Sequence, residues 1–152
     1  MPGFSNRVLI VDDHVDNISW LISFLEFRQY EIEVVTNEGA ARAKLEAVQE
    51  GRDHFAQAIV DIMVPVKGIM ELVEFDEEFY QASNESGVRI CRYARQDLML
   101  DEEKLPIVCI SGREDEALRE ALDDMGIRLF PRVSMPSEES LRDFLVENLP
   151  RL

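Results

Sequence analysis

The chain has 152 residues, of which 46% are hydrophobic and 31% are charged. This composition is typical of a single folded domain with its own core and unlike that of a disordered chain. The formal net charge of −15 repels phosphate groups, so nucleic-acid and membrane-surface binding are not expected. No apolar run reaches the roughly 18 to 20 residues that cross a bilayer, and the first residues do not resemble a signal peptide. We therefore expect a cytoplasmic protein.

Strands and helices are predicted to alternate along the chain. A short apolar run at residues 8–11 indicates a buried strand that ends at Asp12 and Asp13. Alternating strands and helices predict a doubly wound α/β fold, with a parallel sheet covered by helices on both faces. The further predicted strands cover residues 32–35, 58–60, 107–110 and 127–130, and the predicted helices carry Leu21, Leu45, Ala94, Leu122 and Leu145.

One long connection interrupts this rhythm. Residues 66–86 separate the third predicted strand from the next helix, whereas loops in such folds usually have about 2 to 6 residues. This insertion mixes apolar residues such as Phe75 and Phe79 with acidic ones such as Glu74 and Glu78. The mixture predicts a short amphipathic helix that packs as a flap on a single domain covering residues 1–152.

Cysteine and histidine residues do not form a recognisable metal motif. Cys91 and Cys109 lie in apolar segments without a CxxC pair, so we expect two reduced cysteines packed in the core. His14 directly follows the acidic pair, and His54 lies in the polar stretch GRDHF. Both histidines are expected at the surface.

Acidic and hydroxyl side chains follow three of the predicted strands. Asp12 and Asp13 end the first strand, Asp61 ends the third and Ser111 ends the fourth. Ligands of open parallel sheets bind beyond the carboxyl ends of the strands, where these side chains converge. Crowded carboxylates need a cation, and oxygen ligands favour Mg²⁺ or Mn²⁺. Such a site also suits phosphoryl transfer to a carboxylate, which gives an aspartyl phosphate.

The segments RVLIVDDH, AIVDIMVP and PIVCISG, in this order, resemble the receiver domains of two-component response regulators. The resemblance covers residues 6–149 apart from the insertion, and it implies a flavodoxin-like strand order 2-1-3-4-5. It also implies that a sensor histidine kinase or a phosphotransfer protein supplies the phosphoryl group. The signal would then pass to an unknown downstream protein.

The same resemblance assigns roles to individual residues. Asp61 corresponds to the phosphoacceptor, and Asp12 and Asp13 correspond to the metal-binding pair. Met63 matches the position that lends a backbone carbonyl to the metal. Ser111 matches the hydroxyl residue that meets the phosphoryl group, and Phe130 matches the aromatic switch that turns inward with it.

The segment RLFPRVSMP departs from the family pattern. Receiver domains place a lysine after the fifth strand, where it contacts the phosphoryl group, and an ungapped count places Val133 in that slot. A shift of one residue brings in Arg132, whose guanidinium carries charge and can bind phosphate oxygens. Arg132 is therefore a candidate substitute for the lysine.

Three functions follow from these residues. The first is a stand-alone receiver that is not an enzyme beyond phosphorylating itself from small phosphodonors and dephosphorylating itself. The alternative is a pseudo-receiver, a binding module that keeps the fold and acts without phosphorylation because of the missing lysine and the acidic insertion. The third is a phosphohydrolase that works through an aspartyl phosphate, but such enzymes need a second aspartate where this chain has Met63.

Overall fold

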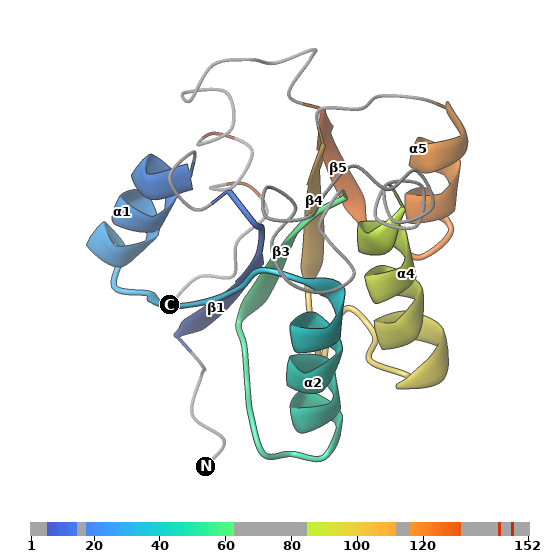
Figure 1. Ribbon diagram of the computed structural model, residues 1–152, viewed down its shortest axis with the longest axis horizontal. Coiled ribbons are helices and arrows are strands. Elements are labelled where there is room, and N and C mark those ends of the chain that lie inside the picture. Colours follow the sequence, from blue (N-terminus) through green and yellow to red (C-terminus); the bar gives the residue numbers. More distant parts are fainter. Residues whose placement is uncertain are drawn as a thin grey trace, which may run out of the picture.

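A computed structural model describes residues 6–14, 18–62, 85–111 and 116–131, together with Asp143 and Glu147. In this part of the chain, five parallel strands form one sheet in the order β2-β1-β3-β4-β5 (Figure 1). The doubly wound sheet predicted from the sequence and its expected strand order are confirmed. The strands are β1 (Arg7–Val11), β2 (Glu31–Val35), β3 (Gln57–Asp61), β4 (Ile107–Ser111) and β5 (Arg128–Pro131).

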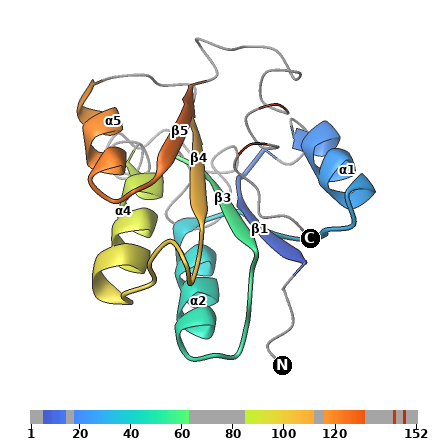
Figure 2. The same cartoon turned by 180° about the vertical axis from the view of Figure 1, so that it is seen from behind.

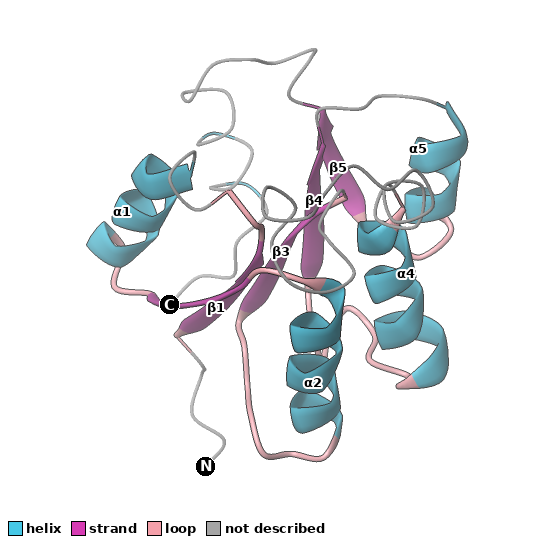
Figure 3. Ribbon diagram, in the orientation of Figure 1, coloured by secondary structure: helices cyan, strands magenta, loops and turns pink. Residues whose placement is uncertain are grey.

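Helices cover both faces of the sheet, as Figures 1 and 2 show from opposite sides. Helix α1 (Ser19–Phe27) lies on one face. Helices α2 (Glu38–Gln49), α4 (Ser86–Arg92) and α5 (Glu116–Asp123) lie on the other (Figure 3). Helix α4 continues directly into a π-helical turn, Tyr93–Asp97. Within the described residues, every helix is too short or too polar to span a membrane.

The alternation of side chains along each strand divides the core into two layers. On β1, Val8 and Ile10 pack with α1, whereas Leu9 and Val11 pack on the side of α2, α4 and α5. Because both faces are covered, the central strands are almost continuously apolar, as is usual for parallel sheets. This arrangement leaves the strand ends as the places where polar side chains collect.

Two predicted features fall largely outside the described residues. Of the last predicted helix only Asp143 and Glu147 are described, and both are helical, whereas Leu141, Phe144, Leu145 and Leu149 lie outside the described residues, as does most of the insertion at 66–86. Ser86, at the end of the predicted insertion of about residues 66–86, is the first residue of α4. The amide of Gly87, the second residue of α4, donates a hydrogen bond to the Ile62 carbonyl oxygen at 2.7 Å and so ties the start of the helix to the end of β3.

Candidate metal centre

The turn after β1 is fixed by hydrogen bonds to the backbone. The amide of Asp12 donates to the Val35 carbonyl oxygen at 3.0 Å, which extends the pairing of β1 with β2. The amide of His14 donates to the Asp12 carboxylate at 2.8 Å, the pattern by which aspartate side chains stabilise turns. The sequence Asp12-Asp13-His14 is therefore held in a defined conformation at the carboxyl edge of the sheet.

The Asp13 side chain is buried, and it has no hydrogen-bond donor among the residues that the structure describes. Its side chain is only 1% exposed, and neither of its carboxylate oxygens accepts a hydrogen bond from any residue that the structure describes. The Nδ1 atom of His14 lies 3.0 Å from Asp13 Oδ1, but the contact lacks hydrogen-bond geometry. A buried carboxylate with no donor is costly unless a cation accompanies it. The two oxygens of Asp13 thus fit a divalent metal ion.

Asp12, Asp13 and His14 form a compact group of potential ligands. One ligand atom from each residue lies within 4.8 Å of the other two. An octahedral ion with ligands at about 2.1 Å needs separations of about 3 to 4.2 Å, so only small side-chain movements would close the site. Asp12 and Asp13 are neighbours in sequence, and His14 joins them in this group. His14 is exposed, as expected from the sequence, but its approach to Asp13 was not predicted, although its position directly after the acidic pair was a signal.

Asp61 and Ser111 lie at the same edge of the sheet, on the next two strands. Asp61 is the half-buried last residue of β3, and the pairing of Val11 with Val60 sets it beside Asp12. Among the described residues, its carboxylate does not belong to the 4.8 Å group. Ser111 ends β4 and is buried.

Phe130 is the remaining predicted site residue that the structure describes. Phe130 is fully buried on the α1 side of the sheet and pairs with Ile110 of β4. Its ring therefore points into the core, one residue before the end of β5. Met63, Arg132 and Val133 lie outside the described residues.

The same architecture occurs in solved structures of receiver domains. Vibrio cholerae chemotaxis response regulator CheY4 is 19% identical, with a TM-score of 0.64 over 95% of this chain and 99% of that chain. Thermotoga maritima response regulator TrrA, in complex with Mg²⁺-BeF, is 18% identical, with a TM-score of 0.61 over 94% and 98%. The chain has the receiver fold. No protein-family model matches the sequence, and no curated protein is similar to it.

A third neighbour of the receiver fold carries a metal ion. It is the receiver domain of sensor histidine kinase PA1611 from Pseudomonas aeruginosa, with a magnesium ion coordinated in its active-site cleft. It is 16% identical to this chain, with a TM-score of 0.58 over 95% of this chain and 97% of that chain. At such identities the likeness concerns the fold.

Gly87 allows α4 to lie directly behind the end of β3 in this receiver fold. A Cβ atom at Gly87 would lie 2.4 Å from Ile62 Cα and 2.6 Å from the Asp61 carbonyl oxygen. Both contacts are with backbone, so a side chain here would have to displace the strand end. Sequence reasoning did not single out Gly87, because this approach depends on how α4 packs on the sheet.

A buried thiol pair lies in the core beneath Asp61. Cys109 pairs with Val60 in the sheet, and its Sγ atom lies 3.6 Å from that of Cys91 on α4. The hydrogen bond with Cys91 and burial, together with the negative charge of Asp61, raise the pKa of Cys109 well above its ordinary value. Both cysteines are free and buried, which confirms the expectation from the sequence, and a protonated thiol is a poor metal ligand.

Proposed function

We propose that this chain is a receiver domain of two-component signalling that accepts a phosphoryl group on Asp61. Asp12, Asp13 and Asp61, with the backbone carbonyl of Met63, would hold Mg²⁺ or Mn²⁺. The observation that carries the proposal is the Asp13 carboxylate, which is buried beside Asp12 without a hydrogen-bond donor among the described residues. A receiver fold with this feature at the carboxyl edge of its sheet has a ready place for a divalent ion.

The chemistry assigns a separate role to each side chain. An oxygen of the Asp61 carboxylate attacks phosphorus, and the phosphorus–nitrogen bond of a phosphohistidine on the kinase or phosphotransfer protein breaks. The metal, when bound, neutralises negative charge on the phosphoryl oxygens. The Ser111 hydroxyl donates a hydrogen bond to the phosphoryl group, and Arg132 supplies the cation that Val133 cannot.

The output is a change in protein contacts. Ser111 and Phe130 lie on neighbouring strands, since Phe130 pairs with Ile110. Movement of the Ser111 hydroxyl toward the phosphoryl group would therefore change the position of the Phe130 ring. A downstream protein in the cytoplasm would bind the surface formed by α5, β5 and the predicted last helix, and this binding would depend on phosphorylation.

Phosphorylation of the whole chain tests this function. The protein is incubated with acetyl phosphate and Mg²⁺, and its intact mass is compared with that of Asp61→Asn and of a sample with EDTA. We expect one added phosphoryl group on the wild type with Mg²⁺, none on Asp61→Asn, and none with EDTA. Addition to Asp61→Asn would show that Asp61 is not the acceptor.

The position of Asp61 outside the compact ligand group favours one alternative, a pseudo-receiver that binds metal without accepting phosphate. Wild type that stays unmodified by acetyl phosphate, and also by a histidine kinase active on another receiver, would support it. Steady turnover of a phosphomonoester would instead support a phosphohydrolase.

A further inference from the structure

We propose that His14 is a ligand in this metal centre and makes it prefer a borderline transition-metal ion, such as Zn²⁺ or Ni²⁺, over Mg²⁺. This inference rests on the proposed metal site but not on phosphoryl transfer. It concerns which ion occupies the carboxyl edge of the sheet.

The geometry places an imidazole nitrogen where a metal ligand would be. His14 Nδ1 lies 3.0 Å from Asp13 Oδ1, a separation suited to neighbouring ligands of one ion. The Asp13 side chain is almost fully buried, and neither of its oxygens has a hydrogen-bond donor within the described part of the chain. An ion between Asp13 and His14 would thus give the Asp13 carboxylate the partner that the described residues do not provide.

The backbone already holds this pair in place. The His14 amide donates to the Asp12 carboxylate, which fixes the turn that carries all three residues, and their ligand atoms lie within 4.8 Å of one another. The His14 side chain is 43% exposed, which leaves the imidazole accessible to an ion that arrives from solvent. A preorganised ligand loses little conformational freedom on binding.

The kind of ligand sets the preference among ions. Mg²⁺ takes oxygen ligands and keeps several waters, so an imidazole adds little to its binding. Zn²⁺ and Ni²⁺ bind imidazole well, and Zn²⁺ sites combine histidine with carboxylate oxygens. His14 should therefore contribute to the affinity for Zn²⁺ and Ni²⁺ and hardly at all to that for Mg²⁺.

The chain offers a matched control, because it contains only two histidines. His54 is exposed and precedes β3 in the connection from α2, at the opposite edge of the sheet. His14→Ala and His54→Ala remove the same side chain, one inside and one outside the proposed site. The metal-free thermal unfolding of each variant shows whether the fold is kept.

Calorimetric titration of the wild type and both variants with Zn²⁺, and separately with Mg²⁺, tests the proposal. We expect His14→Ala to weaken Zn²⁺ binding by about tenfold or more and Mg²⁺ binding by less than about twofold. His54→Ala should change neither affinity. In the wild type, the ¹⁵N resonance of His14 Nδ1 should shift as one equivalent of Zn²⁺ is added.

Other results would overturn the proposal. Absence of Zn²⁺ binding by the wild type, or equal Zn²⁺ affinity in wild type and His14→Ala, would show that His14 is not a ligand. Equal loss of Zn²⁺ and Mg²⁺ affinity would give His14 a structural role only. The metal titrations contain no phosphodonor, so they test His14 as a ligand and not phosphoryl transfer. Failure of the proposed function would appear only in the intact mass of the protein after treatment with acetyl phosphate.

Discussion

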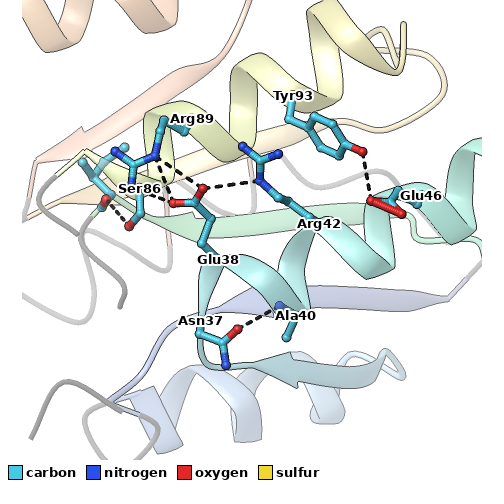
Figure 4. Close-up of polar contacts among 9 residues, drawn as sticks. Asn37, Glu38, Ala40, Arg42, Glu46, Ser86, Arg89 and Tyr93 are labelled. Atoms are coloured by element: carbon cyan, nitrogen blue, oxygen red, sulfur yellow. Dashed lines mark hydrogen bonds and ion pairs between the residues drawn. The ribbon is translucent and has the colours of Figure 1, made fainter. Parts of the chain in front are cut away.

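Two buried carboxylates of this protein have opposite surroundings. Glu38, at the start of α2, accepts hydrogen bonds from Arg89 Nε at 3.0 Å and Nη2 at 2.7 Å, and Arg42 Nε lies 3.3 Å away (Figure 4). Asp13 is at least as deeply buried, with a side chain 1% exposed against 8% for Glu38. Yet neither oxygen of Asp13 has a donor among the described residues.

The difference distinguishes Glu38, a structural carboxylate, from Asp13, a carboxylate suited to binding a cation. The charge of Glu38 is compensated within the protein, and its pairing with Arg89 ties α2 to α4. Buried polar groups are normally satisfied, so an unsatisfied one at the ligand-binding edge of a parallel sheet indicates function. In the proposed function, a bound cation would offset the cost of burying the Asp13 carboxylate.

The largest effect is expected where α4 supports both regions, at Gly87. Gly87→Ala would place a methyl group against the backbone of Asp61 and Ile62. We expect the free energy of unfolding to fall by about 3 kcal/mol, as measured by urea denaturation. Gly126→Ala is the control, since nothing lies within 4 Å of its added Cβ, and its positive φ predicts a loss of only about 1 kcal/mol. Equal losses would contradict the close approach.

Removal of one partner tests the compensated carboxylate. Arg89→Ala leaves the buried Glu38 with Arg42 as its remaining cationic partner among the described residues. We expect the free energy of unfolding to fall by about 2 kcal/mol. This value is reduced because Arg89 is a third exposed. Arg42→Ala should cost about 0.5 kcal/mol, because its ion pair spans one helical turn and the Arg42 side chain is 39% exposed. Urea denaturation measures both. A cost for Arg42→Ala as large as that for Arg89→Ala would contradict this ranking.

Neutralising each carboxylate in turn should have effects of opposite sign. In EDTA, Asp13→Asn removes an uncompensated buried charge, and we expect the free energy of unfolding to rise by about 1 kcal/mol. Glu38→Gln breaks charge-assisted hydrogen bonds and should lower it by about 1 kcal/mol. Thermal unfolding of the two metal-free variants makes the comparison. Destabilisation by Asp13→Asn would mean that Asp13 is satisfied within the protein.

The smallest effect concerns acid stability at the far edge of the sheet. A hydrogen bond from Lys44, helped by Arg7, lowers the pKa of Glu33 below its ordinary value of 4.5. A lowered folded-state pKa gives stability that is present above the unfolded-state value and lost as the pH falls through the folded one. Glu33→Gln should therefore flatten the stability profile below pH 4.5, by no more than about 1 kcal/mol for this partly exposed group. If Glu33→Gln and the wild type lose the same stability at acid pH, as measured by urea denaturation, this prediction is wrong.

Most of the fold could be predicted because it depends on local pattern. The apolar runs that became β1, β3 and β4 are short, rich in β-branched residues and bounded by polar side chains, so their period and length point to buried parallel strands. The order of the strands followed from the resemblance to receiver domains. The end of α5 was signalled by Gly126, whose φ of 69° marks a helix stop.

The site was only partly predictable, because its character depends on contacts between distant residues. The sequence showed that Asp12 and Asp13 end one strand, but not that the buried Asp13 side chain lacks a donor among the described residues. It gave no sign that Arg89 would pair with Glu38, 51 positions away, or that Gly87 would lie against the end of β3. It also did not show that the exposed His14 ring lies 3.0 Å from the Asp13 carboxylate.

An NMR titration with Mg²⁺ tests most directly the claim that the Asp13 carboxylate is completed by a divalent cation. ¹H–¹⁵N spectra of the wild type and of Asp13→Asn are recorded as Mg²⁺ is raised to millimolar concentrations. We predict saturable shifts of the Asp12, Asp13 and His14 amides in the wild type and none at residues 12–14 in the variant. Spectra of the wild type that do not change, or identical shifts in both proteins, would contradict the account.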